Sequence, residues 1–180
     1  MGQPFPYTIR KADASDIDTI HEIYRLIHLQ EANGEVTIGW DPNTYPTRQT
    51  AESALEENTL FVMISEGHIV ASAVINHKPL EAYELVSWKY DAPYHKIGVL
   101  HTLVVHPHYL KRGFGSAFVA FFENYCRDKG CVAVRLDTQV KNERPFRLYP
   151  KLGYRVAGIF DTRFRHLDFP IRLAMFEKKL

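Results

Sequence analysis

The chain of 180 residues is long enough for one substantial hydrophobic core and short for two ordinary domains, so we expect a single domain over residues 1–180. Apolar residues make up 46% and aromatic residues 13%, which excludes a disordered chain, and a formal net charge of +1 disfavours a general nucleic-acid-binding surface. The N-terminus resembles no secretory leader, no apolar run approaches the roughly 20 residues that span a bilayer, and two cysteines fit a reducing compartment. We therefore expect a cytoplasmic protein without membrane contact.

Hydrophobic periodicity and turn residues divide the chain into alternating strands and helices. In chain order we expect a strand at 7–11, a helix from about 15 to 33, a loop at 39–46, a helix at 47–58, strands at 60–65 and 68–76, a partly stranded segment at 78–96, a strand at 97–105, a helix at 113–129, a strand at 131–136, a helix at 142–151, and strands at 154–159 and 172–177. This order predicts a central sheet with helices on its faces. The strand at 131–136 should pair parallel to that at 97–105 through a right-handed crossover.

A basic glycine turn at 111–116 is the most informative feature, because it joins an apolar strand to the start of a long helix. N–H groups at a helix start have no intrahelical partner, the helix dipole adds partial positive charge, and glycine lets an anion approach the backbone. The turn therefore predicts a pyrophosphate site, and the alternative is a solvated basic turn. The residues of this predicted site are Lys111, Arg112, Gly113, Phe114, Gly115 and Ser116.

Other phosphate and metal sites are not indicated. The chain lacks the Gly-x-x-x-x-Gly-Lys-Ser/Thr pattern of nucleotide-binding P-loops. Cys126 and Cys131 flank a helix-to-strand turn without metal-ligand spacing, and His106 and His108 have no further ligands nearby in the sequence. We expect no metal site.

The turn at 112–117, followed by Asn-x-x-Pro-x-x-x-Tyr-x-x-Leu-Gly-Tyr over 142–154, resembles the GNAT superfamily of N-acetyltransferases. Members of that family move the acetyl group of acetyl-coenzyme A to an amine. The resemblance implies a mixed, mostly antiparallel sheet of six to seven strands with about four helices. Two departures are visible, because Leu110 stands where the family's loop commonly has Gln or Arg, and Pro150 should distort or end the helix at 142–151.

The resemblance also implies two catalytic roles. Tyr149 would donate a proton to the departing thiolate, and the alternative is a helix tyrosine packed on the sheet. His101 would be the base that deprotonates the amine, since an imidazole accepts protons near neutral pH. The alternative for His101 is a core histidine bonded to a neighbouring backbone.

By the same resemblance, a strand N–H near Leu103 or Val104 would stabilise the carbonyl oxygen at a β-bulge. Leu103 and Val105 would pair with the pantetheine arm of the cofactor through backbone atoms. Asn142 would bond this arm, cap its helix, or do both.

The resemblance also implies that Trp40, Tyr45 and Trp88 lie in segments that cover the acceptor cleft, where they would form an aromatic wall. The alternative is that they are ordinary packing residues. We predict an acetyl-coenzyme A-dependent enzyme that acetylates a primary amine, expected on a small molecule, by direct transfer. The alternatives are a peptide or protein N-terminal acetyltransferase and a coenzyme-binding sensor or partner module without turnover. The resemblance is compatible with a homodimer.

Overall fold

The computed structural model describes residues 5–163 and 170–180, and its order of strands and α-helices is the one expected from the sequence. The strands are β1 (Thr8–Lys11), β2 (Leu60–Ser65), β3 (His68–Asn76), β4 (Ile97–Val105), β5 (Ala133–Gln139), β6 (Arg155–Thr162) and β7 (Ile171–Lys179). The α-helices are α1 (Ile17–Ala32), α2 (Arg48–Glu56), α3 (Phe114–Asp128) and α4 (Glu143–Lys151). Short 3₁₀ turns are η1 (Ala14–Asp16), η2 (Glu81–Leu85), η3 (Tyr94–Lys96) and η4 (Pro107–Tyr109).

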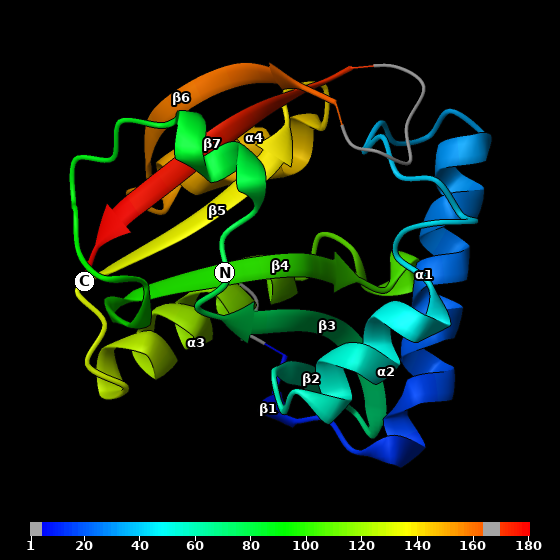
Figure 1. Cartoon of the computed structure of the whole chain (residues 1–180). Helices are drawn as coiled ribbons and strands as arrows, with labels where there is room; N and C mark the ends of the chain where they lie inside the picture. Colours follow the sequence, from blue (N-terminus) through cyan, green and yellow to red (C-terminus); the bar gives the residue numbers. More distant parts are fainter. Residues whose placement is uncertain (1–4, 164–169) are drawn as a thin grey trace.

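The strands form one seven-stranded sheet in the order β1-β2-β3-β4-β5-β7-β6. Neighbouring strands are antiparallel except β4 and β5, which α3 connects in parallel, as the sequence predicted. These two strands pair only where Ile97–Val99 lies opposite Ala133–Arg135. Beyond this point they diverge, and the sheet opens between them (Figure 1).

Helices and a long connecting segment cover the two faces of the sheet. Helices α1 and α2 pack on β2 and β3 on one face, and α3 and α4 pack on the opposite face. Residues 80–92, between β3 and β4, cover the remaining part of the first face over β4, β5 and β7. We call residues 80–92 the strap.

The apolar periodicity of α1 places one stripe in the core. Ile20, Ile23, Tyr24 and Ile27 are buried, and a reciprocal capping box at Asp13 sets the start of η1 and α1. In α3, Phe118, Phe122 and Cys126 are buried, whereas Phe121 and Tyr125 are half-buried and pack around Phe61.

The segment 78–96 contains no strand, contrary to the sequence-based expectation. Its N–H groups at Lys89 and Tyr90 bond to the side chain of Glu177 rather than to a neighbouring strand, so the strap follows the sheet without joining it. Strand β5 also extends past the predicted end at 136, as far as Gln139. As expected, Pro150 lies in the last turn of its helix, α4. Within the described residues, no helix is long and apolar enough to cross a membrane.

Candidate active site

A β-bulge in β4 lies where the sheet opens. Val74 of β3 faces His101, but Ser72 faces Val104, so β4 contains one extra residue. Thr102 has a positive φ of 51°, a conformation that a β-branched residue rarely adopts. The resemblance implied a bulge near Leu103 or Val104, and the register shift between His101 and Val104 places it at Thr102 and Leu103.

A cavity of about 300 Å³ passes through the opening between β4 and β5. Trp40, Tyr45 and Asp137 line it from the face that carries α1 and the strap, whereas Asn142 and Tyr149 line it from the α4 side. Most of the remaining wall is apolar and is contributed by Ile38, Leu80, Leu100, Leu103, Ile171 and Leu173. The cavity therefore connects the two faces of the sheet.

Asp137 is the functional candidate that the sequence analysis missed. It follows Leu136 on β5, and its Oδ1 accepts a hydrogen bond of 2.9 Å from the Tyr83 hydroxyl. Burial raises the pKa of Asp137 to about 6, and the Tyr83 hydrogen bond partly opposes this effect. The sequence contained one signal for Asp137, because an ionisable residue directly follows an apolar strand. The sequence analysis ended that strand at Leu136, so Asp137 was not considered part of it.

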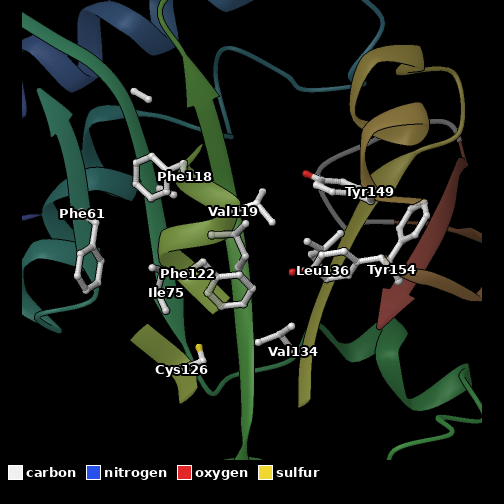
Figure 2. Close-up of a cluster of buried hydrophobic side chains, with 14 of the residues drawn as sticks. Phe61, Ile75, Phe118, Val119, Phe122, Cys126, Val134, Leu136, Tyr149 and Tyr154 are labelled. Atoms are coloured by element: carbon white, nitrogen blue, oxygen red, sulfur yellow. The ribbon is translucent and has the colours of Figure 1, made fainter. Parts of the chain in front are cut away.

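Tyr149 enters the cavity from the opposite face. Its ring packs against Tyr154 and Phe176 at centroid distances of 5.9 and 5.4 Å, and its side chain is 5% exposed. Figure 2 shows Tyr149 extending from α4 with its oxygen directed toward β4. Burial and the charge of Asp137 raise its pKa, so the hydroxyl keeps its proton at neutral pH.

His101 also lines the cavity, but one of its ring nitrogens is already hydrogen-bonded within the protein. Nε2 donates to the carbonyl oxygen of Lys78 at 2.9 Å and lies 3.2 Å from Oδ1 of Asn76. Burial lowers the pKa of His101, which favours the neutral ring. This geometry matches the alternative of a histidine bonded to neighbouring backbone and leaves Nδ1 as the ring's free acceptor.

Two of the three predicted acceptor-side aromatics reach the cavity. Trp40 packs edge-on against Tyr45 at 5.8 Å, and the Tyr45 hydroxyl hydrogen-bonds to the side chain of Thr102 at the bulge. Burial raises the pKa of Tyr45 to about 12. The expectation that Trp88 belongs to this wall is corrected. Trp88 lies outside the cavity wall and stacks on the guanidinium of Arg135 at 4.1 Å.

The basic glycine turn forms an open helix start. Gly113 has a φ of 85°, which a glycine adopts without strain, and Lys111 has a φ of 63°, which is uncommon for a residue with a Cβ. No side chain caps α3, and the first intrahelical N–H is that of Ala117, which bonds to Gly113 at 3.0 Å. A Cβ built at Gly113 would meet nothing within 4 Å, so no neighbouring side chain packs against this glycine. Such an arrangement fits a diphosphate.

Side chains around this turn divide into exposed and buried groups. The Arg112 guanidinium lies 4.9 Å from the Phe5 ring and 5.0 Å from the Tyr109 ring, which fixes a positive charge beside the helix start. Phe114 is 3% exposed and packs in the core, so only its backbone N–H is available to a ligand. Gly115 and Ser116 likewise offer backbone N–H groups in the first turn.

Asn142 stands at the N-terminus of α4 without capping it, because its side chain makes no capping hydrogen bond. The side chain lines the cavity instead. The capping role of Asn142 is not seen, and its bond to the cofactor arm stays a prediction. Among the described residues no cluster of three His, Cys, Asp or Glu side chains could hold a metal ion.

Comparison with solved structures finds the same fold in several acetyltransferases. An acetyltransferase of the GNAT family from Streptococcus agalactiae has a TM-score of 0.77 at 21% identity, covering 97% of each chain. A putative acetyltransferase from Salmonella typhimurium, solved with its cofactor acetyl-CoA, has a TM-score of 0.71 at 17% identity, covering 96% of this chain and 93% of that one.

The ribosomal-protein-S18-alanine N-acetyltransferase of Escherichia coli has a TM-score of 0.67 at 16% identity, covering 97% of this chain and 94% of that one. A search of curated protein sequences found no match. The acetyltransferase (GNAT) family model matches residues 19–154. This match spans most of the chain and includes both cofactor motifs, and the cavity and open helix start fit acetyl-CoA as co-substrate. The protein therefore belongs to the acetyltransferase (GNAT) family and is an acetyl-CoA-dependent N-acetyltransferase.

Proposed function

We propose that the enzyme acetylates a primary amine on a compact, largely apolar small molecule by direct transfer. The observation that carries this proposal is the cavity through the sheet, which a carboxylate enters from one face and a phenol from the other. The diphosphate-binding turn lies on the α3 side, so the thioester would arrive from that face and the amine from the face of the strap. A volume of about 300 Å³ suits a small acceptor.

Asp137 supplies the negative charge and the base. An alkyl ammonium has a pKa near about 10.4, so the acceptor arrives protonated at neutral pH. With a pKa of about 6, the Asp137 carboxylate is largely ionised at pH 7.5, so it can pair with the ammonium and remove one proton, directly or through water. His101 remains the second candidate for this step through Nδ1.

Tyr149 completes the proton balance. When the amine nitrogen forms its bond to the acetyl carbon and the carbon–sulfur bond breaks, a thiolate leaves and requires a proton. The Tyr149 hydroxyl supplies that proton. A buried phenol is a weaker acid than a thiol with a pKa of roughly 8.5, so this transfer is uphill by itself and requires the hydroxyl to be held beside the sulfur and then reprotonated. The nitrogen loses its second proton as the amide forms, and this proton, carried through water, restores the Tyr149 hydroxyl, while Asp137 releases the first proton to solvent.

Direct transfer requires no nucleophile from the protein. The two cysteines, Cys126 and Cys131, are buried and lie outside the cavity between β4 and β5. Burial raises the pKa of both thiols, which keeps them in the unreactive protonated form. Their burial also keeps the background low in an assay that detects free thiol.

A panel of acceptors tests the proposal. The wild-type enzyme, acetyl-CoA and a thiol-detecting reagent would be combined with apolar alkyl and arylalkyl amines, polyamines, and peptides with free N-termini. We expect thiol release and a product 42 Da heavier with the apolar amines, where the increment is the mass of a transferred acetyl group. Preference for peptides would instead indicate a peptide or protein N-terminal acetyltransferase. The Escherichia coli neighbour is named as a ribosomal-protein-S18-alanine N-acetyltransferase.

A coenzyme-binding module without turnover is the remaining alternative. It predicts heat on titration with acetyl-CoA and no acetylation of any amine in the panel. The presence of Asp137 and Tyr149 in one cavity favours turnover. We place the enzyme in the cytoplasm as a single domain, and size-exclusion chromatography with light scattering distinguishes a monomer from a homodimer.

A further inference from the structure

The proposed function gives no role to a buried phenol that contacts Asp137. Tyr83, in η2 of the strap, is 2% exposed and stands behind Asp137, outside the cavity wall. Its hydroxyl donates to Oδ1 of Asp137 at 2.9 Å, and Oδ2 makes no hydrogen bond within the described residues. We propose that Tyr83 is a positioning residue that fixes the Asp137 carboxylate and keeps it ionised for the acceptor amine. This inference rests on the proposed function.

The strap holds Tyr83 in a defined place. The carbonyl oxygen of Tyr83 accepts a hydrogen bond of 3.0 Å from Nε1 of Trp88, and the two rings pack at a centroid distance of 5.3 Å. Trp88 in turn lies against the guanidinium of Arg135 on β5, which also donates to the carbonyl oxygen of Tyr90 at 3.0 Å. Arg135 and Asp137 are two residues apart on β5 and therefore lie on the same face.

Glu177 anchors the far end of this part of the strap. This fully buried carboxylate on β7 accepts N–H groups from Lys89 at 2.8 Å and from Tyr90 at 3.3 Å. Arg155 on β6 pairs with the same carboxylate, so its charge is compensated. The Tyr83 hydroxyl is thus held against Asp137 by contacts from three neighbouring strands.

Few groups influence the charge of Asp137 besides Tyr83. Tyr149 of α4, Tyr45 of the loop before α2, and His101 of β4 line the same cavity, and burial favours the uncharged form of each. No lysine or arginine in the described part of the chain lines the cavity. Burial raises the pKa of Asp137, and the Tyr83 hydrogen bond is the contact that lowers it. Without this hydroxyl, a larger fraction of Asp137 is protonated at neutral pH.

The decisive variant is Tyr83→Phe, which keeps the ring and removes the hydroxyl. A hydrogen bond to a charged group changes an ionisation constant by about tenfold, so the acidic limb of the kcat/KM profile should move up by about one pH unit. The variant should lose activity severalfold at pH 6.5 and recover most of it at pH 9. A loss of equal size at all pH values would overturn the assignment, because a structural defect has that signature.

Tyr24→Phe is the matched control. Tyr24 is also a fully buried tyrosine, its hydroxyl has no hydrogen-bond partner within the described residues, and it packs with α1 and α2 rather than with the strap. Tyr24→Phe also removes one phenol oxygen from the core, and we expect its kcat/KM profile against pH to coincide with that of the wild type. A displaced profile in Tyr24→Phe would show that loss of any buried hydroxyl has this effect and would overturn the proposal.

A measurement independent of turnover separates this inference from the proposed function. Carbon-13 NMR of aspartate carboxyl groups gives the Asp137 pKa in the free protein, with Asp137→Asn identifying the signal. We expect a higher pKa in Tyr83→Phe, and an unchanged value refutes the role of Tyr83 whatever the enzyme acetylates. If the wild type acetylates no amine while the carboxyl titrates as expected, the proposed function fails instead. Should Tyr83→Phe not fold, Trp88→Phe removes the bond to the Tyr83 carbonyl and should move the carboxyl pKa in the same direction by less.

Discussion

Replacing Asp137 by asparagine should make the protein more stable and less active. Asparagine has the same shape and can still accept the Tyr83 hydrogen bond through its side-chain oxygen, but it carries no charge. The pKa of Asp137 is about 6 in the folded protein, against an ordinary value of 3.8. A raised folded-state pKa means that the folded protein disfavours the ionised form.

The sign and size of the effect follow from proton linkage. Well below pH 3.8 the carboxyl is protonated in both states and contributes no difference. Between about pH 4 and 6 the unfolded chain ionises while the folded protein keeps its proton, so stability falls as the pH rises. Above pH 6 the full penalty is present. The difference of about two units between the folded and unfolded pKa values corresponds to a loss of stability of about 3 kcal/mol at most. Water in the cavity lowers this penalty, so we expect about 1–3 kcal/mol.

Urea denaturation of the wild type and Asp137→Asn at pH 4 and pH 8 measures this difference. The free energy of unfolding of the variant minus that of the wild type should be about 1–3 kcal/mol larger at pH 8 than at pH 4. The Tm of the variant at pH 8 should exceed that of the wild type by several degrees. Its kcat/KM should fall by about 100-fold or more. Equal stability differences at both pH values would refute the linkage argument, and undiminished turnover would refute the role of Asp137 in the reaction.

Three further variants test other parts of the structure. Arg112→Glu should weaken acetyl-CoA binding at least severalfold in calorimetry, most strongly at low salt, because it reverses a charge beside the open helix start. Tyr149→Phe should reduce kcat by about 100-fold while the Kd for acetyl-CoA changes little, and equal turnover would exclude Tyr149 as the acid. Glu177→Gln should destabilise the fold by about 2–4 kcal/mol in urea, since it leaves Arg155 without its partner and weakens the anchor of the strap.

Local sequence patterns were sufficient for most of the fold. The β2–β3 hairpin around Gly67 and the capping boxes at Asp13 and Thr47 depend on residues close in the chain. The strap shows where such reasoning stops. Its backbone partners include Glu177, which is distant in sequence, so no local period records its conformation.

The candidate site divides in the same way. The basic turn and Tyr149 lie in motifs of adjacent residues, so the sequence could predict them as candidates. Asp137 became visible only when β5 was followed to its end and the Tyr83 hydroxyl was found beside it. Trp88 illustrates the converse, because its aromatic character suggested a substrate wall while Arg135 and the Tyr83 carbonyl hold it against the sheet.

The opening between β4 and β5 links the stability of the sheet to its function. Past Val99, the β4 backbone has no partner on β5, so its polar groups on that side face the cavity. Backbone N–H and C=O groups without partners cost about 1–3 kcal/mol each when buried, so this edge requires water or a ligand. We propose that the amides of the pantetheine arm bond to Leu103 and Val105 there. A fully paired sheet would be more stable, but it would close the passage through which Asp137 and Tyr149 act on the same molecule.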